Sequence, residues 1–380
     1  MADNVSKKIL ITGGAGFIGS RLAKKLRSMN HSVRVLDNLS PQVHHDMTVV
    51  AELEGAGCEF ILGDVLDRSL LPKVMVGCNL VYHLAAETGT GQSMYEVNRY
   101  NSINIDGTVN ILEAIKNSGN SIEKIVLASS RSVYGEGKYF CPMHGEKFPS
   151  FRQNADLLNG HFEHRCDECK ADLIPVATDE QSPTSPGSIY AATKRYQEDL
   201  VRLYHLMNGL SATVFRFQNV YGPGQSLSNP YTGIISIFSN LIRAKKTINI
   251  FEDGLSIRDF VYVDDVVHFL CEELELSSNE YAVINIGSGI KSTVLDVVNH
   301  LEVALNLEAD FVISKQVRSG DIRSNFADLK SLSRRFRSHK FLALNDGIRE
   351  FTEWALKKQF DNATSYERSL ETLRNNGLLK

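Results

Sequence analysis

The sequence ITGGAGFIGS, residues 11–20, places glycines at positions 13, 16 and 19 directly after a short β-branched run. Glycine at these positions allows a tight turn, lets the backbone approach a pyrophosphate, and lets the following helix pack closely on the strand. The unpaired N–H groups at the start of such a helix bind phosphate oxygens. A purely structural turn has the same spacing, so the stretch favours dinucleotide binding without establishing it.

Short β-branched runs alternate with helical patterns around this turn. The runs predict strands at 8–12, 32–37, 58–64, 79–86, 122–130 and 211–217. Apolar residues at helical spacing predict helices at 17–29, 92–118 and 187–208. Strands that alternate with helices predict an α/β fold, a Rossmann-type doubly wound parallel sheet with helices on both faces.

Composition narrows the class of partner. The chain has 380 residues, a formal net charge of −4 and a sequence pI near 6.3, so nothing favours nucleic acid or an anionic membrane over a small molecule. No apolar run reaches the roughly 18 residues of a spanning helix, and the N-terminus reads as a first strand rather than a signal peptide. We therefore expect a cytoplasmic protein whose six cysteines are thiols or metal ligands rather than disulfides.

Acidic residues end the second and third predicted strands. Asp37 lies about 20 residues after the glycine turn, where a carboxylate accepts hydrogen bonds from an adenosine ribose. The same carboxylate repels a 2'-phosphate, and Asn38 beside it adds no positive charge, so NAD is favoured over NADP. Asp64 could accept from the adenine amino group or could cap a helix.

The stretch SIYAATK, residues 188–194, places Tyr190 and Lys194 on one face of a predicted helix. A lysine ammonium near a phenol lowers the phenol pKa and makes tyrosine a usable base near neutral pH. The Y-x-x-x-K pattern alone is common by chance. Its combination with the glycine turn, Asp37 and the serine-rich strand end at 128–130 is a strong signal.

Taken together, these motifs resemble the extended short-chain dehydrogenase/reductase family, within it the NAD-dependent nucleotide-sugar epimerases and dehydratases. The resemblance covers about residues 8–357, through TGGAGFIGS (12–20), GDV (63–65), HLAA (83–86), SSRSVYG (129–135), YAATK (190–194), RFQNVYGPGQS (216–226) and GLSIRDFVYVDD (254–265). It implies a homodimer through helices 92–118 and 187–208. It also implies an NAD-binding domain over 1–220 and, over 221–380, a smaller interleaved α/β lobe that binds most of a nucleotide sugar.

The resemblance assigns roles by position. It implies that Ser130 and Tyr190 hold the sugar 4-hydroxyl, and that Lys194 tunes the phenol and reaches the nicotinamide ribose. The implied substrate ligands for the diphosphate and ribose are Asn219, Arg258, Arg318 and Asp321, although either arginine could instead form a surface ion pair. The expected cofactor-binding residues are Gly13, Gly16, Phe17, Ile18, Gly19, Asp37, Asn38, Asp64, Val65, Leu84, Ala85, Ala86, Asn104, Tyr190 and Lys194. Asn104 has a second interpretation as a helix-surface amide.

Enzymes of this family are expected to begin alike: tyrosine takes the proton of the sugar C4 hydroxyl while the C4 hydride passes to NAD, giving a 4-keto sugar. In the dehydratases an Asp-Glu pair follows the serine or threonine. Here those positions hold Arg131 and Ser132, neither of which readily serves as acid or base, and we expect Arg131 to turn outward or to pair structurally.

The sequence therefore favours C4 epimerisation of a nucleoside-diphosphate hexose. The alternatives are a 2-epimerase, a 4-ketoreductase or a 4,6-dehydratase of the same family, and a catalytically silent NAD-binding protein.

Residues 136–180 form a cysteine-bearing insertion. Cys141 and His144 make a C-x-x-H pair, and Cys166 and Cys169 a C-x-x-C pair. Four such ligands match a closed tetrahedral zinc site, in which the metal would stabilise the fold of a polar loop rather than catalyse a reaction. The alternative is that the cysteines are free thiols in a surface insertion.

Overall fold

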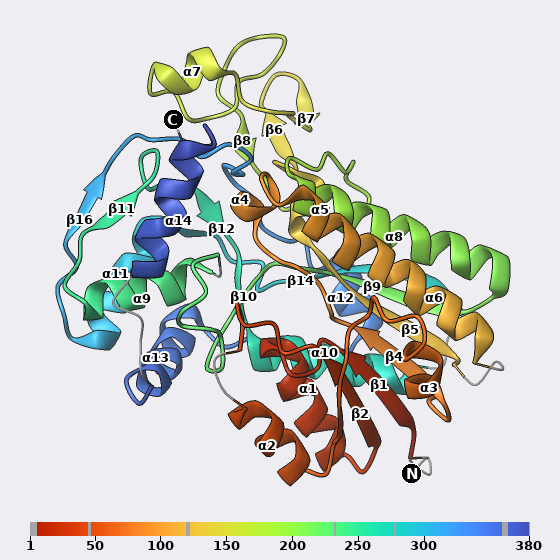
Figure 1. The fold of residues 1–380 in the computed structure, drawn as a ribbon. Coiled ribbons are helices and arrows are strands. Elements are labelled where there is room, and N and C mark those ends of the chain that lie inside the picture. The colour runs from red at the N-terminus through yellow and green to blue at the C-terminus, as the bar shows by residue number, and fades with distance from the viewer. Residues whose placement is uncertain are drawn as a thin grey trace.

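A computed structural model describes residues 6–44, 47–118, 122–231, 233–276, 279–358 and 364–379. Its centre is a seven-stranded sheet in the order β14-β9-β5-β4-β1-β2-β3, and every neighbouring pair is parallel (Figure 1). The strands are β1 (Lys8–Thr12), β2 (Ser32–Asp37), β3 (Glu59–Leu62), β4 (Leu80–His83), β5 (Lys124–Ser130), β9 (Ser211–Phe217) and β14 (Tyr281–Ile286). The predicted Rossmann-type α/β fold is confirmed.

Alternating side chains attach helices to both faces of this sheet. In β1, Ile9 and Ile11 belong to a core cluster with α1 (Phe17–Ser28) and α10 (Val263–Glu275). Leu10 belongs to a second cluster with α3 (Leu71–Met75), α6 (Gly107–Asn117) and α8 (Ile189–Asn208). Both faces are covered, as parallel sheets require.

The strand order reverses between β1 and β4, because β2 and β3 lie on one side of β1 and β4 and β5 on the other. A crevice at the carboxyl ends of the strands forms at such a point and is where ligands bind in doubly wound sheets. The glycine turn after β1, the segment after β4 and Ser130 at the end of β5 therefore lie at one edge of the sheet.

One strand of the sheet was not predicted from the sequence. β14 comes from beyond residue 220 and pairs with β9, so the chain returns to the first half of the molecule. The boundary near residue 220 stays a prediction, and the interleaving of the two halves is extensive.

The second lobe packs around its own core of α9 (Ile234–Arg243), α11 (Val294–Leu305) and α13 (Leu344–Ala355). Its short strands pair two by two: β10 (Asn219–Tyr221) with β13 (Phe260–Tyr262), β11 (Ile248–Ile250) with β16 (Phe311–Ile313), and β12 (Ile257–Arg258) with β15 (Ser292–Thr293). Three further helices are α2 (Thr48–Gly55), α12 (Lys330–Arg335) and α14 (Thr364–Asn375).

The prediction of one continuous helix over 92–118 is wrong. It consists of α4 (Thr90–Ser93), α5 (Val97–Tyr100), a π-helical segment (Asn101–Asp106) and α6. The break occurs because Glu96 has φ −103° and ψ 45°, outside the helical region. By contrast, α8 starts with a side-chain cap, since the Ser188 hydroxyl accepts a hydrogen bond from the Ala191 N–H.

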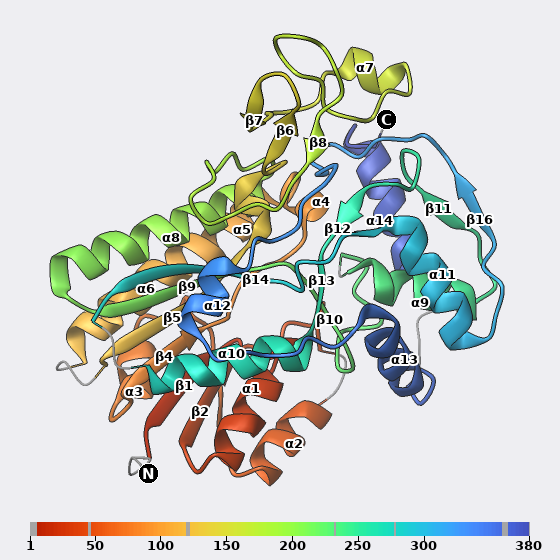
Figure 2. The ribbon, with the colours of Figure 1, turned by 180° about the vertical axis from the view of Figure 1, so that it is seen from behind.

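The cysteine-bearing insertion contains β6 (Tyr139–Cys141), β7 (Gly145–Lys147), β8 (Ile174–Pro175) and α7 (Asn154–Leu158), with its three strands in the order β7-β6-β8. Both ribbon views show it projecting beyond the two lobes (Figures 1 and 2). Across the described ranges, no helix has the length and apolar character needed to cross a membrane.

Candidate active site

The structure brings Ser130, Tyr190 and Lys194 together where α8 packs on β5. The Ser130 side chain is close enough to the Tyr190 phenol to lower its pKa. The Ser130 Oγ accepts hydrogen bonds from the N–H and the hydroxyl of Ser132, at 3.2 and 3.0 Å, which leaves its own proton for another acceptor. The Lys194 ammonium donates to the carbonyl oxygen of Ala128 over 2.9 Å. Serine, phenol and ammonium thus line one strand end.

Burial raises the pKa of Tyr190, and the hydrogen bond from Ser130 and the charge of Arg131 lower it in part. Burial also lowers the pKa of Lys194 to about 7, opposed by Glu198. The sequence predicted that Lys194 would lower the phenol pKa. In the structure Arg131 is a cation that lowers it, and the Lys194 ammonium donates to a backbone carbonyl, so the effect of Lys194 on the phenol stays a prediction.

Arg131 does not turn outward, contrary to one of the two expectations. Its Nε donates to Oδ1 of Asn219 over 3.1 Å, and its Nη1 is buried without a hydrogen-bond partner among the described residues. Burial and, after it, the charge of Arg258 lower the Arg131 pKa to about 9. Arg131 is therefore a cation inside the site, hydrogen-bonded to Asn219, which is a predicted substrate ligand. The sequence did not predict this position of Arg131.

The predicted substrate ligands gather beside Arg131. Arg318 forms an ion pair with Asp321, with Nη2 and Oδ1 2.8 Å apart and the two side chains 30% and 15% exposed. Arg258 donates to the carbonyl oxygens of Ile257 and Arg323. Burial lowers the pKa of Arg258, and Asp321 is the largest opposing influence. Arg318 forms an ion pair, as the alternative to a ligand role predicted, but the pair with Asp321 lines a cavity and lies beside Arg131 and Arg258.

The glycine turn after β1 has the close approaches that its sequence predicts. Gly13 has φ 68°, and a Cβ there would lie 2.6 Å from the Ala85 backbone nitrogen. A Cβ on Gly19 would lie 2.4 Å from the Gly13 carbonyl oxygen. Gly16 precedes α1, which starts with Phe17 and Ile18 and has no side-chain cap, so its first N–H groups are available to phosphate.

Acidic residues follow β2 and β3 at the same edge. The buried Asp37 carboxylate accepts from the N–H groups of Ala15 and Leu39, at 3.0 and 2.9 Å. Asp64 accepts from the Asn38 amide at 2.8 Å and from the Leu66 N–H at 2.9 Å. The second bond closes a turn, and no described helix begins there, so the capping interpretation of Asp64 is wrong.

These residues fit NAD. The glycine turn, the uncapped start of α1 and the segment of Leu84, Ala85 and Ala86 after β4 lie at the crevice, and Asp64 and Val65 lie in the segment after β3. Asp37 lies where a ribose diol would donate hydrogen bonds to its carboxylate, and its negative charge opposes a 2'-phosphate. The individual cofactor contacts stay predictions.

Asn104 is fully buried and is not a helix-surface amide. Its Oδ1 accepts from the Glu87 N–H at 2.8 Å, and its Nδ2 donates to the Thr193 hydroxyl at 2.9 Å. The amide therefore joins the segment after β4 to the helix that carries Tyr190. Direct contact of Asn104 with a cofactor stays a prediction.

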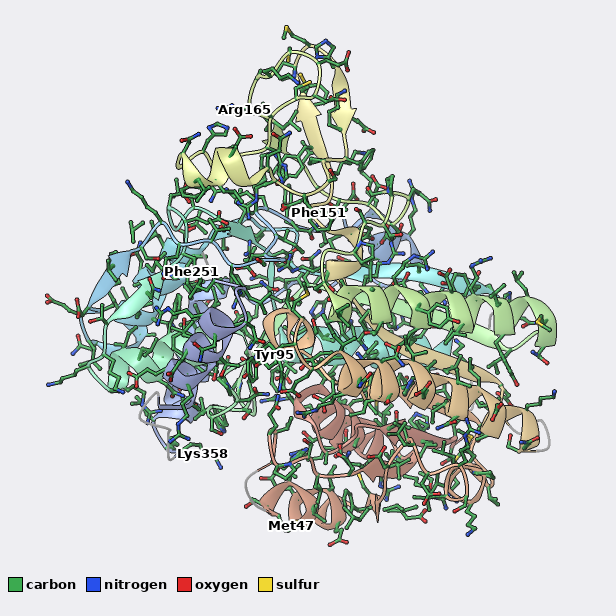
Figure 3. All side chains as sticks on the ribbon, turned by 45° about the horizontal axis from the view of Figure 1, so that its top comes forward. Met47, Tyr95, Phe151, Arg165, Phe251 and Lys358 are labelled. Carbon is green, nitrogen blue, oxygen red and sulfur yellow. The ribbon has the colours of Figure 1, made fainter. Side chains whose placement is uncertain are left out.

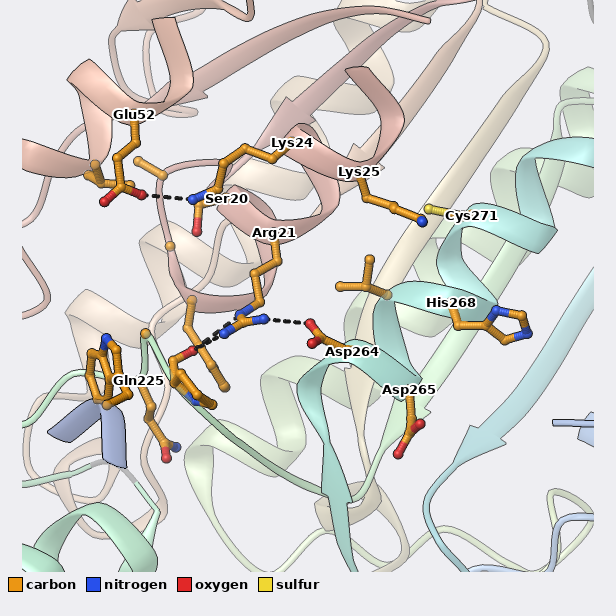
Figure 4. A pocket seen from close by; sticks show the side chains of 18 of the residues that line it. Ser20, Arg21, Lys24, Lys25, Glu52, Gln225, Asp264, Asp265, His268 and Cys271 are labelled. Atoms are coloured by element: carbon orange, nitrogen blue, oxygen red, sulfur yellow. Dashed lines mark hydrogen bonds and ion pairs between the residues drawn. The ribbon is translucent and has the colours of Figure 1, made fainter. Parts of the chain in front are cut away.

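A cavity of about 1850 Å³ lies between α1, α2 and α10 (Figure 4). It reaches the glycine turn at Gly16, but the three predicted catalytic residues do not line it. Two ion pairs lie in its wall, Arg21 with Asp264 and Lys24 with Glu52. A second cavity, of about 680 Å³, is lined by Arg318 and Asp321 and by the insertion. Two of the predicted substrate ligands, Arg318 and Asp321, therefore favour the second cavity as part of the substrate site, and the three predicted catalytic residues line neither cavity.

The four residues of the predicted zinc site lie together in the insertion. Their ligand atoms all lie within 4.8 Å of one another. Nδ1 of His144 is 3.6 Å from the Cys141 sulfur and 3.4 Å from the Cys166 sulfur, and the sulfurs of Cys141 and Cys169 are 3.6 Å apart. The other three cysteines, Cys58, Cys78 and Cys271, are buried thiols elsewhere in the chain.

A dinucleotide crevice at a strand-order reversal, with serine, tyrosine and lysine at its open end, defines the class of enzymes that oxidise and reduce alcohols with a nicotinamide cofactor. Residues 9–155 and 168–287 match the NAD dependent epimerase/dehydratase family. The chain belongs to this family. The unmatched residues between these two ranges lie within the insertion.

Similar proteins are 4-epimerases of nucleotide sugars. The chain is 36% identical over 350 residues to dTDP-L-rhamnose 4-epimerase of Burkholderia thailandensis, covering 92% of this chain and 94% of that protein. It is 31% identical to UDP-glucuronate 4-epimerase 2 of Arabidopsis thaliana, over 92% of this chain and 75% of the relative. The structure of UDP-glucuronic acid 4-epimerase from Bacillus cereus with UDP-glucuronic acid and NAD matches with a TM-score of 0.76 and 27% identity, covering 92% and 99% of the two chains.

Proposed function

We propose that the protein is an NAD-dependent epimerase that inverts C4 of a nucleoside-diphosphate hexose through a 4-keto sugar. The observation that carries the proposal is the juxtaposition of Ser130 and Tyr190 at a strand end that is followed by Arg131 and Ser132. An acid and a base for elimination would occupy those two positions. The relatives named above, each a 4-epimerase by name, support the same reaction.

Each group has a defined part in this reaction. Tyr190 takes the proton of the C4 hydroxyl, and Ser130 donates to the phenolate and so stabilises it. NAD, when bound, would accept the C4 hydride and return it to the other face of the sugar. Tyr190 then returns the proton to the same oxygen. Asn219, Arg258 and Arg318 would hold the diphosphate, and Asp321 the ribose, while the sugar turns.

Arg131 favours epimerisation over the alternatives. A guanidinium does not give up its proton at neutral pH, so it cannot protonate a departing C6 hydroxyl. Its charge instead faces Tyr190 and lowers the phenol pKa, which helps the proton transfer that epimerisation needs. The names of the relatives favour a 4-epimerase over a 4-ketoreductase, a 2-epimerase or a silent binding protein.

The test is a panel of dTDP-, UDP-, GDP- and CDP-sugars incubated with the purified protein, with products separated by chromatography. Conversion of at least one sugar into its C4 epimer, without net formation of NADH, is the expected result. Net oxidation of added NADH would indicate a reductase, and loss of water from the sugar a dehydratase. No conversion of any member would contradict the proposal.

We further propose that the insertion holds structural zinc. A tetrahedral site with zinc–sulfur bonds of about 2.3 Å has sulfur–sulfur edges of about 3.8 Å, close to the 3.6 Å between Cys141 and Cys169. N–H groups of Met143 and His144 hydrogen-bond to the Cys141 sulfur, an arrangement that stabilises a thiolate. Glu168 faces the other ring nitrogen of His144 at 3.6 Å and can orient the ring.

We propose that the protein forms a homodimer through α8. Apolar side chains remain exposed on α8, among them Leu203 at 48%, Leu206 at 65% and Met207 at 82%. Such a row on a helix that the family resemblance assigns to a dimer supports a two-fold homodimer. The cytoplasmic location stays a prediction.

A further inference from the structure

The insertion contributes a wall to the second cavity. The cavity, of about 680 Å³, is within the range of small-molecule sites. One side is the segment 314–322, which carries Arg318 and Asp321, and another is Gly135, Ser185 and Gly187 close to the ends of β5 and α8. Residues 149–152, 157, 158 and 160 of the insertion complete it.

Phe151 is the most prominent side chain of this wall. It is 68% exposed although it is aromatic, and Figure 3 shows it where the insertion meets the rest of the molecule. A Cβ on Gly187 would lie 3.3 Å from Cε1 of Phe151, so the ring edge lies against the backbone three residues before Tyr190. Leu158, which also lines the cavity, is 80% exposed.

Ion pairs hold the wall in place. Arg152, next to Phe151, pairs with Glu252 over 2.7 Å and donates to the carbonyl oxygen of Asp321 over 3.3 Å. Arg323, whose side chain is 1% exposed, binds Glu163 of the insertion and Glu252 of the second lobe. Buried pairs of this kind are costly to break, so the insertion is fixed against the substrate residues.

We infer that the insertion is part of the substrate site and that Phe151 contacts the bound nucleotide sugar, with its nucleoside diphosphate held by Arg318 and Asp321. The inference rests on the proposed function. A cavity lined by apolar side chains with a few convergent charges is the usual form of a ligand site, and the occupant would cover Phe151 and Leu158. Phe151 is then a specificity residue in the insertion, and Leu158 belongs to the residues between the two ranges of the family match.

The test compares Phe151→Ala with Phe148→Ala. Phe148 lies in the same insertion and is 42% exposed, but it does not line the cavity. Calorimetric titration with dTDP and UDP, and KM for the nucleotide sugar that the wild type converts, are measured for both. We expect Phe151→Ala to weaken binding about tenfold, the usual effect of removing one aromatic contact, and Phe148→Ala to leave it unchanged.

The outcomes separate the two proposals. Equal weakening for free nucleotide and nucleotide sugar places Phe151 on the nucleotide half, and weakening for the nucleotide sugar alone places it on the sugar half. Both support the inference. Wild-type affinity and KM in Phe151→Ala and in Leu158→Ala would overturn it while leaving the epimerase proposal intact. A wild type that neither binds nucleotide nor converts any sugar would overturn both.

Discussion

The Nε of Arg131 donates a hydrogen bond to Oδ1 of Asn219, 3.1 Å away and 88 residues later in the chain. Arg131 also lowers the pKa of Tyr190, which burial raises. One guanidinium thus faces both the proton acceptor and a predicted ligand of the diphosphate.

Replacing Arg131 by glutamine should move the acid limb of the pH–rate profile to higher pH. The active form of Tyr190 is the phenolate, and removing the nearby positive charge raises the pKa of the phenol, so a given fraction of phenolate needs a higher pH. The profile of kcat/KM between pH 5 and 10 measures this. Arg131→Lys keeps the charge and is the control. An unshifted limb in Arg131→Gln would contradict the role.

Tyr190→Phe removes the hydroxyl alone, so the ring should still pack at the edge of Tyr100, whose centroid is 6.4 Å away. Loss of a positioned acid–base group lowers a rate on the order of a hundred- to ten-thousand-fold. Epimerisation and the transient NADH absorbance on adding substrate should fall together, with bound cofactor retained. A variant that keeps more than about a tenth of the wild-type rate would rule out the 4-keto mechanism.

Denatured protein should release NAD rather than NADP. The Asp37 carboxylate is buried beside the glycine turn and would repel a 2'-phosphate there. Chromatography of the nucleotides in the acid supernatant checks this. Recovery of mainly NADP would mean that the contacts assigned to Asp37 are wrong.

The double change Cys166→Ser and Cys169→Ser should remove zinc and lower the thermal midpoint. The core of the insertion is small, formed by Tyr139, Leu173 and three of the cysteines, so metal affinity supplies much of its folding free energy. Elemental analysis and a thermal scan measure both effects. His161→Ala, a change in the insertion outside the four ligands, should keep the metal. Wild-type protein without zinc would defeat the proposal.

A charge on the exposed face of α8 should break the dimer. Leu206→Glu places a carboxylate where an apolar side chain is 65% exposed, and burying it in an interface would be costly. Light scattering at micromolar concentration should change from dimer to monomer. Val303→Glu, on α11 and 83% exposed in the other lobe, is the control. A monomeric wild type would show that α8 has no such partner.

Local sequence patterns predicted the strands of the sheet, but not which side chains meet at the carboxyl ends of those strands. The six predicted strands are all present because each is a β-branched run bounded by turns. The strand β14 was not predicted, although its residues AVINI (282–286) have the same character, because the elements around it are short. Ser130 and Tyr190 meet because a strand end and the start of a packed helix are neighbours in this fold. The inward position of Arg131 depends on Asn219 in another segment, and no local pattern encodes such a contact.

The return of β14 to the first half of the molecule determines how the chain can be divided. Six residues of β14, Tyr281 to Ile286, pair with β9, all of which is buried. A fragment ending at residue 220 would leave one side of β9 with a row of open N–H and C=O groups, which is a template for association with other chains. Such a fragment should aggregate rather than bind cofactor, and the two lobes of the intact chain should unfold in one cooperative transition.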